Sequence, residues 1–423
     1  MPIPHFIEVI ATVLFAVAIV HTFSVPIFAR LAHKNGPHAG VFHALAEVEV
    51  VFGFWAFVLM AIMAFGVGTQ GMASYIDTRN FTEPLFVFAI MVVAASRPII
   101  ELLSVVVRLI ARLIPVQRHL ATFFVVLTFV PLAGSLITEP AAMTLAALLL
   151  RDGYFKRPGH SAFKYMTLGV LFVNVSIGGV LTAYAAPPVL MVVKAFDWDS
   201  AYMASNFGWR AVAGVIVNAL LLTFINRKLL SQGEVQTHVG VTREKPCRVP
   251  VVTMLVHVLF LIGVVVSAHH PAIFLGLLMM FIGFCEAYQR YQSRLMIKEG
   301  LLVGFFLAGL VLLGGLQKWW LQDLLGGLSP DVLFWGAMVL TALTDNAALT
   351  YLGSLVDGTS QAWRYMLVAG AVTGGGLTVI ANAPNPAGFA ILKSEFTDGT
   401  ISAAPLFAAA LVPTLIAATF FLI

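Results

Sequence analysis

TEPAAMT at residues 138–144 and TDNAALT at residues 344–350 follow one pattern: a threonine, an acid, a helix breaker or an amide, two alanines and a threonine. Farther along the chain, GGVLTAYAAPP at 178–188 parallels GGGLTVIANAP at 374–384. The two motifs occur in the same order in each half, which indicates an internal repeat. The alternative interpretation is a chance similarity between apolar segments rich in glycine and alanine.

The composition around these motifs indicates a membrane protein. Of the 423 residues, 60% are hydrophobic and 10% are charged, whereas about a quarter of the residues of a soluble domain are charged. Apolar runs long enough to cross a bilayer follow one another with few polar gaps. The expected surroundings are therefore the lipid bilayer, and a soluble catalytic domain is excluded. The net charge of +4 is typical of basic cytoplasmic loops, so no nucleic-acid partner is expected.

Hydropathy and turn residues divide the chain into an all-α polytopic membrane protein. Two apolar stretches, 119–150 and 330–356, are each interrupted by a short polar cluster and are interpreted as re-entrant hairpins. The predicted crossings are residues 5–30, 41–68, 82–114, 162–194, 203–226, 249–268, 271–292, 299–316, 363–393 and 402–423.

Basic residues predict the orientation of these segments. Most of the 24 lysines and arginines fall in loops that the segment order places on one side, and basic loops are typically cytoplasmic. Both termini then lie outside, and a cytoplasmic linker at 228–248 separates a first half, 1–227, from a second half, 249–423. With five transmembrane segments and one hairpin in each half, the two copies are predicted to be inverted-topology repeats.

The glycines and prolines of 178–188 and 374–384 predict that the crossings at 162–194 and 363–393 are broken inside the membrane. Non-helical backbone is tolerated there only where protein or a water-filled cavity satisfies its polar groups. The breaks and the hairpin tips are therefore expected to meet around a cavity. In particular, Asp345 and Asn382 are expected to lie close together.

Glu139 and Asp345 place one carboxylate at each predicted hairpin tip. Acids inside a membrane are costly and usually functional, and this pair would repel an anionic substrate. Oxygen ligands suit a small, hard cation, so both acids are predicted to bind Na⁺ as a metal ion, and protons would compete for the same carboxylates. The alternative for each acid is an ion pair that locks its hairpin. The expected ion- and proton-binding residues are Ser135, Thr138, Glu139, Thr182, Thr344, Asp345, Asn346, Thr378, Asn382 and Asn385.

Other patterns give weaker predictions. His43, Glu47 and Glu49 lie in the crossing at 41–68, with His43 and Glu47 four residues apart, and they could form a proton relay or a second cation site; the alternative is an interfacial cluster. Neither a His-Glu-x-x-His helix nor a Gly-x-Ser-x-Gly elbow is present, so an enzyme is not expected. The two cysteines lack metal-type spacing, and no cofactor is expected. A channel is left open by these patterns.

The acid and amide at a hairpin tip, followed by a glycine-rich broken helix bearing threonine, asparagine and proline, resemble the ion transporter superfamily. LTDNAAL at 343–349 and GGGLTVIANAPNPAG at 374–388 are most similar to its sodium/proton antiporters and to the bacterial "putative sodium/proton antiporter" family. The resemblance implies inverted repeats, cation sites at the hairpin tips, exchange of sodium for protons across a prokaryotic cytoplasmic (inner) membrane and, often, a homodimer. A carboxylate, other anion or arsenite permease of the same superfamily is the alternative.

The first half departs from the antiporter pattern at two positions. Pro140 stands where an asparagine is expected, and Ala186 stands where the second half has Asn382. The first site is therefore expected to bind sodium more weakly or to serve protons more than sodium.

Overall fold

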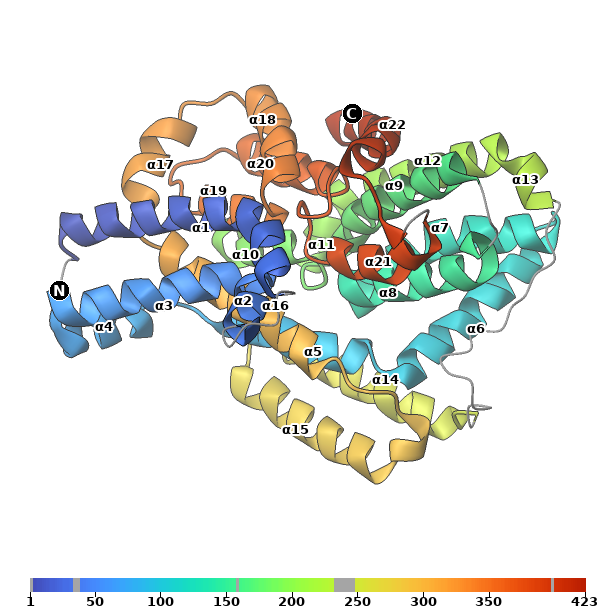
Figure 1. Cartoon of the computed structure of the whole chain (residues 1–423), viewed down its shortest axis with the longest axis horizontal. Helices are drawn as coiled ribbons and strands as arrows, with labels where there is room; N and C mark the ends of the chain where they lie inside the picture. Colours follow the sequence, from blue (N-terminus) through green and yellow to red (C-terminus); the bar gives the residue numbers. More distant parts are fainter. Residues whose placement is uncertain (1–2, 33–38, 157–159, 232–247, 397–398) are drawn as a thin grey trace.

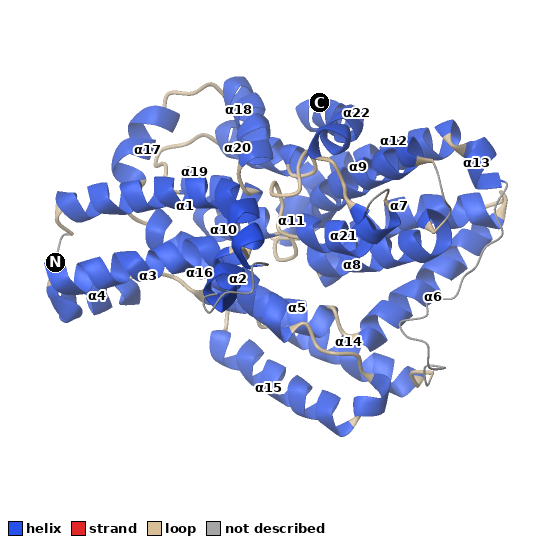
Figure 2. Cartoon of the chain, in the orientation of Figure 1, coloured by secondary structure: helices blue, strands red, loops and turns tan. Residues whose placement is uncertain are grey.

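The computed structural model describes residues 3–32, 39–156, 160–231, 248–396 and 399–423, and over these residues every regular element is helical (Figures 1 and 2). Most of the predicted linker at 228–248 lies outside the described residues. The helices of the first part of the chain are α1 (His5–Ala32), α2 (Ala39–Leu45), α3 (Val48–Gly66), α4 (Gly68–Asp77), α5 (Thr82–Ala94), α6 (Arg97–Leu113), α7 (Arg118–Ile137), α8 (Glu139–Leu150), α9 (Ser161–Gly178), α10 (Pro187–Phe196), α11 (Ser200–Met203), α12 (Trp209–Ile225) and α13 (Arg227–Ser231).

The second part of the chain is also helical over the residues that the structure describes. Its helices are α14 (Val251–Val266), α15 (Pro271–Ala287), α16 (Ile297–Gly314), α17 (Lys318–Leu325), α18 (Pro330–Leu343), α19 (Asn346–Ser354), α20 (Gln361–Gly374), α21 (Asn385–Leu392) and α22 (Ala403–Leu422). Short 3-10 or π turns lie at Arg151–Phe155, Gly179–Leu181, Ala204–Gly208, Gln289–Tyr291 and Lys393–Glu395.

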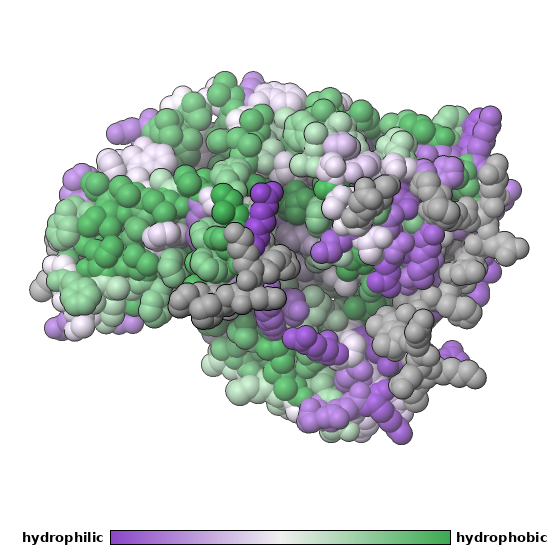
Figure 3. All heavy atoms as spheres, viewed as in Figure 1, coloured by the Kyte–Doolittle hydropathy of each residue, from purple (hydrophilic) through white to green (hydrophobic). Residues whose placement is uncertain are grey.

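The chain is a multi-span membrane protein. Over the described residues, seven helices are long and apolar enough to cross a bilayer, or eight if the bent pair α5 and α6 forms one span. Hydrophobic side chains cover the face over α1 and α3 and much of α15 (Figure 3). Two predicted crossings contain the shorter helices α14 and α15, with 16 and 17 residues. At a rise of 1.5 Å per residue these helices measure about 25 Å, somewhat less than the hydrocarbon core.

The crossing predicted at 82–114 contains a sharp bend. The structure divides it into α5 and α6, which meet at an angle of 65°. Ser96 is extended at the junction, and Pro98 lies in the first turn of α6. Proline is accommodated in a first helical turn, but it lacks the N–H that a continuous helix would bond to Ala94 O, which favours a new helix over continuation of the old one.

The two hairpins and the two broken helices pack in an interlocked way. In each half the first segment of the broken helix lies against the first hairpin arm: α9 packs on α7, and α20 packs on α18. The second segments pack on the hairpin of the other half, α10 on α19 and α21 on α8. Gly178 and Gly374 permit the first contacts, because a Cβ there would collide with the backbone of Pro131 and Met338, respectively. The four motifs are thereby brought to one place.

Candidate functional site

The first hairpin tip holds a fully buried carboxylate at a helix N-terminus. Thr138 separates α7 from α8 with a positive φ of 77°, and Glu139 is the first residue of α8 and 0% exposed. Pro140 follows in the first turn, where its missing N–H costs no helical hydrogen bond. The N-terminus of a helix favours negative charge, which helps to hold an acid at this depth.

An amide from the second broken helix reaches the first carboxylate. Asn382 Nδ2 donates a hydrogen bond of 2.8 Å to Glu139 Oε2, and Asn382 is 1% exposed. Glu139 Oε1 has no hydrogen-bond partner among the described residues. Gly179 faces this carboxylate closely, because a Cβ at that position would overlap it. The second broken helix thus holds the Glu139 carboxylate through Asn382, and Gly179 of the first broken helix leaves room for it.

The second hairpin tip is built differently. Asp345 is the N-cap of α19, and its Oδ1 accepts hydrogen bonds from Ala347 N at 2.8 Å and Ala348 N at 3.2 Å. The next residue, Asn346, donates its backbone N–H to Ala381 O at 3.1 Å, which joins the tip to the second break.

Asp345 and Asn382 line the same cavity, which has a volume of about 450 Å³. Thr344 lines it too, whereas Glu139 and Thr378 are not among its lining residues. The expected proximity of Asp345 and Asn382 therefore appears in the structure, but the side-chain hydrogen bond of Asn382 goes to Glu139. Sequence spacing does not predict this partner, because the contact follows from α21 packing on the hairpin of the other half.

The candidate hydroxyls bind the broken helices to the first hairpin arms. Thr182 donates to Ser135 O at 2.6 Å, and Thr378 donates to Ala342 O at 2.8 Å. Ser135 Oγ donates to Gly178 O at 2.7 Å, and Asn385 Nδ2 donates to Gly375 O and Thr378 O, both at 2.8 Å. In these bonds the side chains act as hydrogen-bond donors. Their side-chain oxygens can therefore still act as acceptors.

Several buried oxygens in this region have no hydrogen-bond donor among the described residues, although buried polar atoms are normally partnered. They belong to the hairpin tips and to the second broken helix, and all are hard ligands suited to a small cation. The unpartnered atoms are Thr138 Oγ1, Glu139 Oε1, Asn346 Oδ1, Asn382 Oδ1 and Asn385 Oδ1. Neutral Asn346 is also unpartnered at Nδ2, and this nitrogen lies beside Gly375, where a Cβ would come within 2.9 Å of it.

The structure does not place His43 and Glu47 on one helix. His43 belongs to α2, which ends at Leu45, and Glu47 is the N-cap residue of α3. Glu47 forms an ion pair with Lys298 of α16 at 3.3 Å, and the two side chains are 43% and 59% exposed. The helical spacing on which the relay was predicted is therefore wrong, because the chain breaks between the two residues. The relay itself stays a prediction.

Comparison with known proteins identifies the family. No curated protein shows a significant sequence match to the chain. A family model described as "Putative Na+/H+ antiporter" matches residues 6–423, which is nearly the whole sequence. The protein is accordingly a transporter and not an enzyme, and the ions are its transported substrates, not cofactors. The chain belongs to the "Putative Na+/H+ antiporter" family.

Proposed function

We propose that this protein exchanges sodium for protons across a prokaryotic cytoplasmic membrane, with ion and proton competing for Glu139 and Asp345. Lithium would be accepted by the same oxygen chemistry. The observation that carries this proposal is the group of buried, unpartnered oxygens around Glu139 and Asn382. Such a group is poorly satisfied without a ligand, and a desolvated sodium ion supplies the missing positive charge.

The competition follows from the chemistry of a buried carboxylate. A charged carboxylate in a low-dielectric region needs a nearby cation or a bound proton. Sodium bound to Glu139 and its neighbouring amide oxygens would satisfy the charge on one side of the membrane. A proton would satisfy it after sodium has left on the other side. Each carboxylate then alternates between two neutralised states, and sodium and proton travel in opposite directions.

The interlocked packing supports an inverted-topology repeat with two re-entrant hairpins as the frame of this exchange. Each half supplies a hairpin tip and a break, and each break contacts the hairpins of both halves. Such a frame allows one repeat to rock against the other around a fixed site, as in other inverted-repeat transporters. Our proposal includes the predicted orientation, with both termini outside, and a homodimer as the assembly.

Transport into proteoliposomes tests the proposal directly. The purified protein is reconstituted with a pH-sensitive dye, a proton gradient is imposed, and NaCl, LiCl, KCl or sodium-free citrate is added. Dequenching with Na⁺ and Li⁺, and little with K⁺ or citrate, is the expected result. A response to citrate without a response to sodium would instead assign a carboxylate permease. Electroneutral or conductive leakage of sodium without proton movement would point to a channel.

A further inference from the structure

The 450 Å³ cavity beside Asp345 has a second acidic residue in its wall, Glu49 of α3. Most of the cavity wall is aliphatic or aromatic, and the carboxylates of Asp345 and Glu49 are the acidic groups among its lining residues. Asn382 also lines the cavity, is 1% exposed and has an unpartnered Oδ1. An apolar cavity with two acids and an open amide oxygen is suited to a cation.

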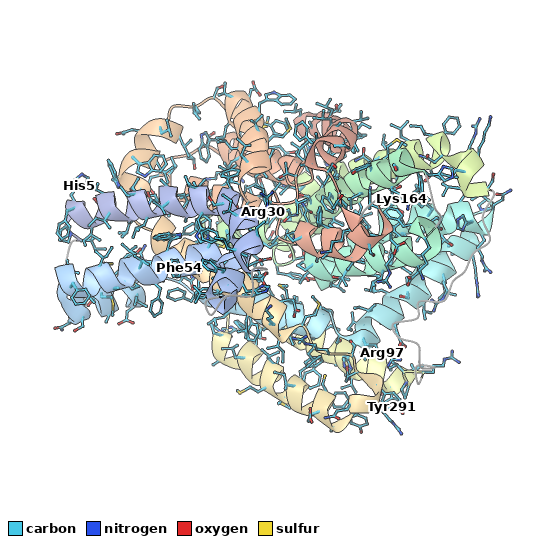
Figure 4. All side chains as sticks on the ribbon, viewed as in Figure 1. His5, Arg30, Phe54, Arg97, Lys164 and Tyr291 are labelled. Atoms are coloured by element: carbon cyan, nitrogen blue, oxygen red, sulfur yellow. The ribbon has the colours of Figure 1, made fainter. Side chains whose placement is uncertain are left out.

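The cavity extends along one face of α1. His5 and Arg30 mark the two ends of this helix (Figure 4). The residues of α1 that line the cavity span about 15 Å at a rise of 1.5 Å per residue, and they are Thr12, Phe15, Ala16, Ile19 and Thr22. The cavity is therefore long enough to connect separate binding positions.

Glu49 lies toward one end of this cavity. Phe52 of α3 packs on Phe15 of α1 with ring centroids 5.4 Å apart, and Gly66 at the end of α3 faces Phe6 at the start of α1, where a Cβ would lie 3.6 Å from the Phe6 ring. The two contacts show that α1 and α3 run antiparallel. Glu49, one turn before Phe52, is thus level with the part of α1 near Thr22. Beyond it, at the surface, lies the ion pair of Glu47 with Lys298.

Glu49 itself makes no side-chain hydrogen bond or ion pair with another described residue. The charged groups that act on it at longer range are Glu47, Lys298 and Asp345. Unpaired acids at membrane depth are rare outside ion pathways. Glu49 lies in the first turn of α3, where a helix N-terminus favours an acid, but no side-chain cap bond or salt bridge among the described residues depends on it.

We propose that Glu49 is a second cation-binding position, through which sodium passes along the cavity between the surface near Glu47 and the site at Asp345. The inference rests on the proposed function and adds a position outside the two hairpins. An ion that leaves bulk water would first be bound by Glu49 with water still attached. It would then exchange that water for the oxygens of Asp345 and Asn382.

Chemical labelling tests binding at Glu49 without any transport. Dicyclohexylcarbodiimide reacts with protonated carboxyl groups in apolar surroundings, and the modified peptide is identified by mass spectrometry. In the detergent-solubilised full chain we expect labelling of Glu49, and protection by NaCl but not by choline chloride. Protection should persist in Asp345→Asn, because Glu49 binds the ion on its own. Absence of labelling, or labelling that sodium does not reduce in either protein, would overturn the proposal.

Transport separates binding at Glu49 from the exchange itself. We expect Glu49→Gln to raise the apparent KM for sodium by about tenfold, the size of one charged interaction, with the maximal rate largely retained. Glu49→Asp, which keeps the charge, should recover most of the affinity. Glu286→Gln, the same change at an exposed position of α15 that does not line the cavity, is the matched control and should stay within about twofold of the parent. An unchanged KM in Glu49→Gln would overturn the pathway.

Loss of exchange in the unmodified protein would refute the proposed function, while the labelling result would still decide whether Glu49 binds sodium.

Discussion

The two hairpin tips carry the same kind of acid in different surroundings. Glu139 is fully buried, receives the Asn382 amide and faces Gly179. Asp345 caps α19 with one carboxylate oxygen and lines the large cavity. The motif positions of the two acids are equivalent, yet one tip is closed over its carboxylate and the other opens to a space that an ion can enter.

This difference indicates that the two acids have different roles. An acid in contact with a cavity can exchange ions and protons with water, whereas an enclosed acid can hold a desolvated ion between amide and carboxylate oxygens. The sequence predicts that the first site binds sodium more weakly or serves protons more, which stays a prediction, but the structure brings the Asn382 amide to Glu139. Ala186 supplies no amide to the second tip, and Pro140 supplies none to the first, so the amide oxygens near Glu139 come from the second half of the chain. Variants at the two tips should therefore fail in different ways.

The largest effect is expected from Asp345→Asn. The amide fills the same volume and can still cap α19, but it neither carries a charge nor exchanges a proton at this position. We expect sodium-dependent proton movement in proteoliposomes to fall to the level of empty liposomes, with normal amounts of folded protein in the membrane. Asp331→Asn, the same change at the exposed start of α18, is the control and should transport normally. Exchange at normal affinity in Asp345→Asn would remove this acid from the mechanism.

Glu139→Gln should produce a different defect. Its amide oxygen can still accept the Asn382 hydrogen bond, but the negative charge that binds sodium is lost. We expect the apparent sodium affinity to drop at least about tenfold, with residual exchange at saturating sodium through Asp345. Sodium titrations at several pH values measure both quantities. If Glu139→Gln and Asp345→Asn had the same kinetic profile, the comparison between the tips would fail.

Much of the architecture could be predicted from hydropathy and local motifs. The helices occupy the predicted segments closely, since apolar runs and Gly/Pro interruptions are local signals, and both acids begin or cap a helix where the motif placed the tips. The contact of Asn382 with Glu139 could not be predicted in this way. The contact forms because α21 packs on the hairpin of the other half. Such long-range packing cannot be predicted from the spacing of residues in the sequence. The break between α2 and α3 contains neither glycine nor proline, so no local residue indicates it. The bend between α5 and α6, in contrast, is indicated by Pro98.

Gly179→Ala should change the first tip through packing alone and so sharpen the difference between the two tips. The backbone at Gly179 accepts alanine, with a φ of −78°, but the new Cβ would overlap the Glu139 carboxylate. We expect the displaced carboxylate to bind sodium less well, as if part of its charge were lost. The sodium affinity should fall roughly three- to tenfold. Gly283→Ala on α15 has open space and is the matched control. A Gly179→Ala protein with unchanged sodium affinity would show that Glu139 is not held in place by this contact.

Asn382→Leu removes an oxygen from both tips at once, because Asn382 bonds Glu139 and lines the cavity with Asp345. Leucine retains similar volume but leaves Glu139 Oε2 without its donor. We expect a severalfold loss of sodium affinity while proton binding by the carboxylates continues. Isothermal titration with NaCl reports the affinity independently of transport. Asn382→Asp would instead add a charge beside Glu139; equal affinities for the two variants would contradict a role for the amide.

The smallest effects should come from the hydroxyls that bind each broken helix to its hairpin, and here the two tips should agree. Thr182 donates to Ser135 O and Thr378 donates to Ala342 O, so Thr182→Val and Thr378→Val each remove one equivalent hydrogen bond with little change in shape. Hydrogen bonds between membrane helices contribute about 0.6 kcal/mol on average and rarely above about 1.7 kcal/mol, so both variants should unfold about 1 to 2 °C earlier in a detergent thermal-shift assay and still transport. Thr419→Val, which removes a hydroxyl bond within α22 alone, provides the control for a bond that joins no two elements. A large loss in one variant and none in the other would mean that the two halves are not held by equivalent contacts, and the symmetry on which the comparison of their tips depends would have to be abandoned.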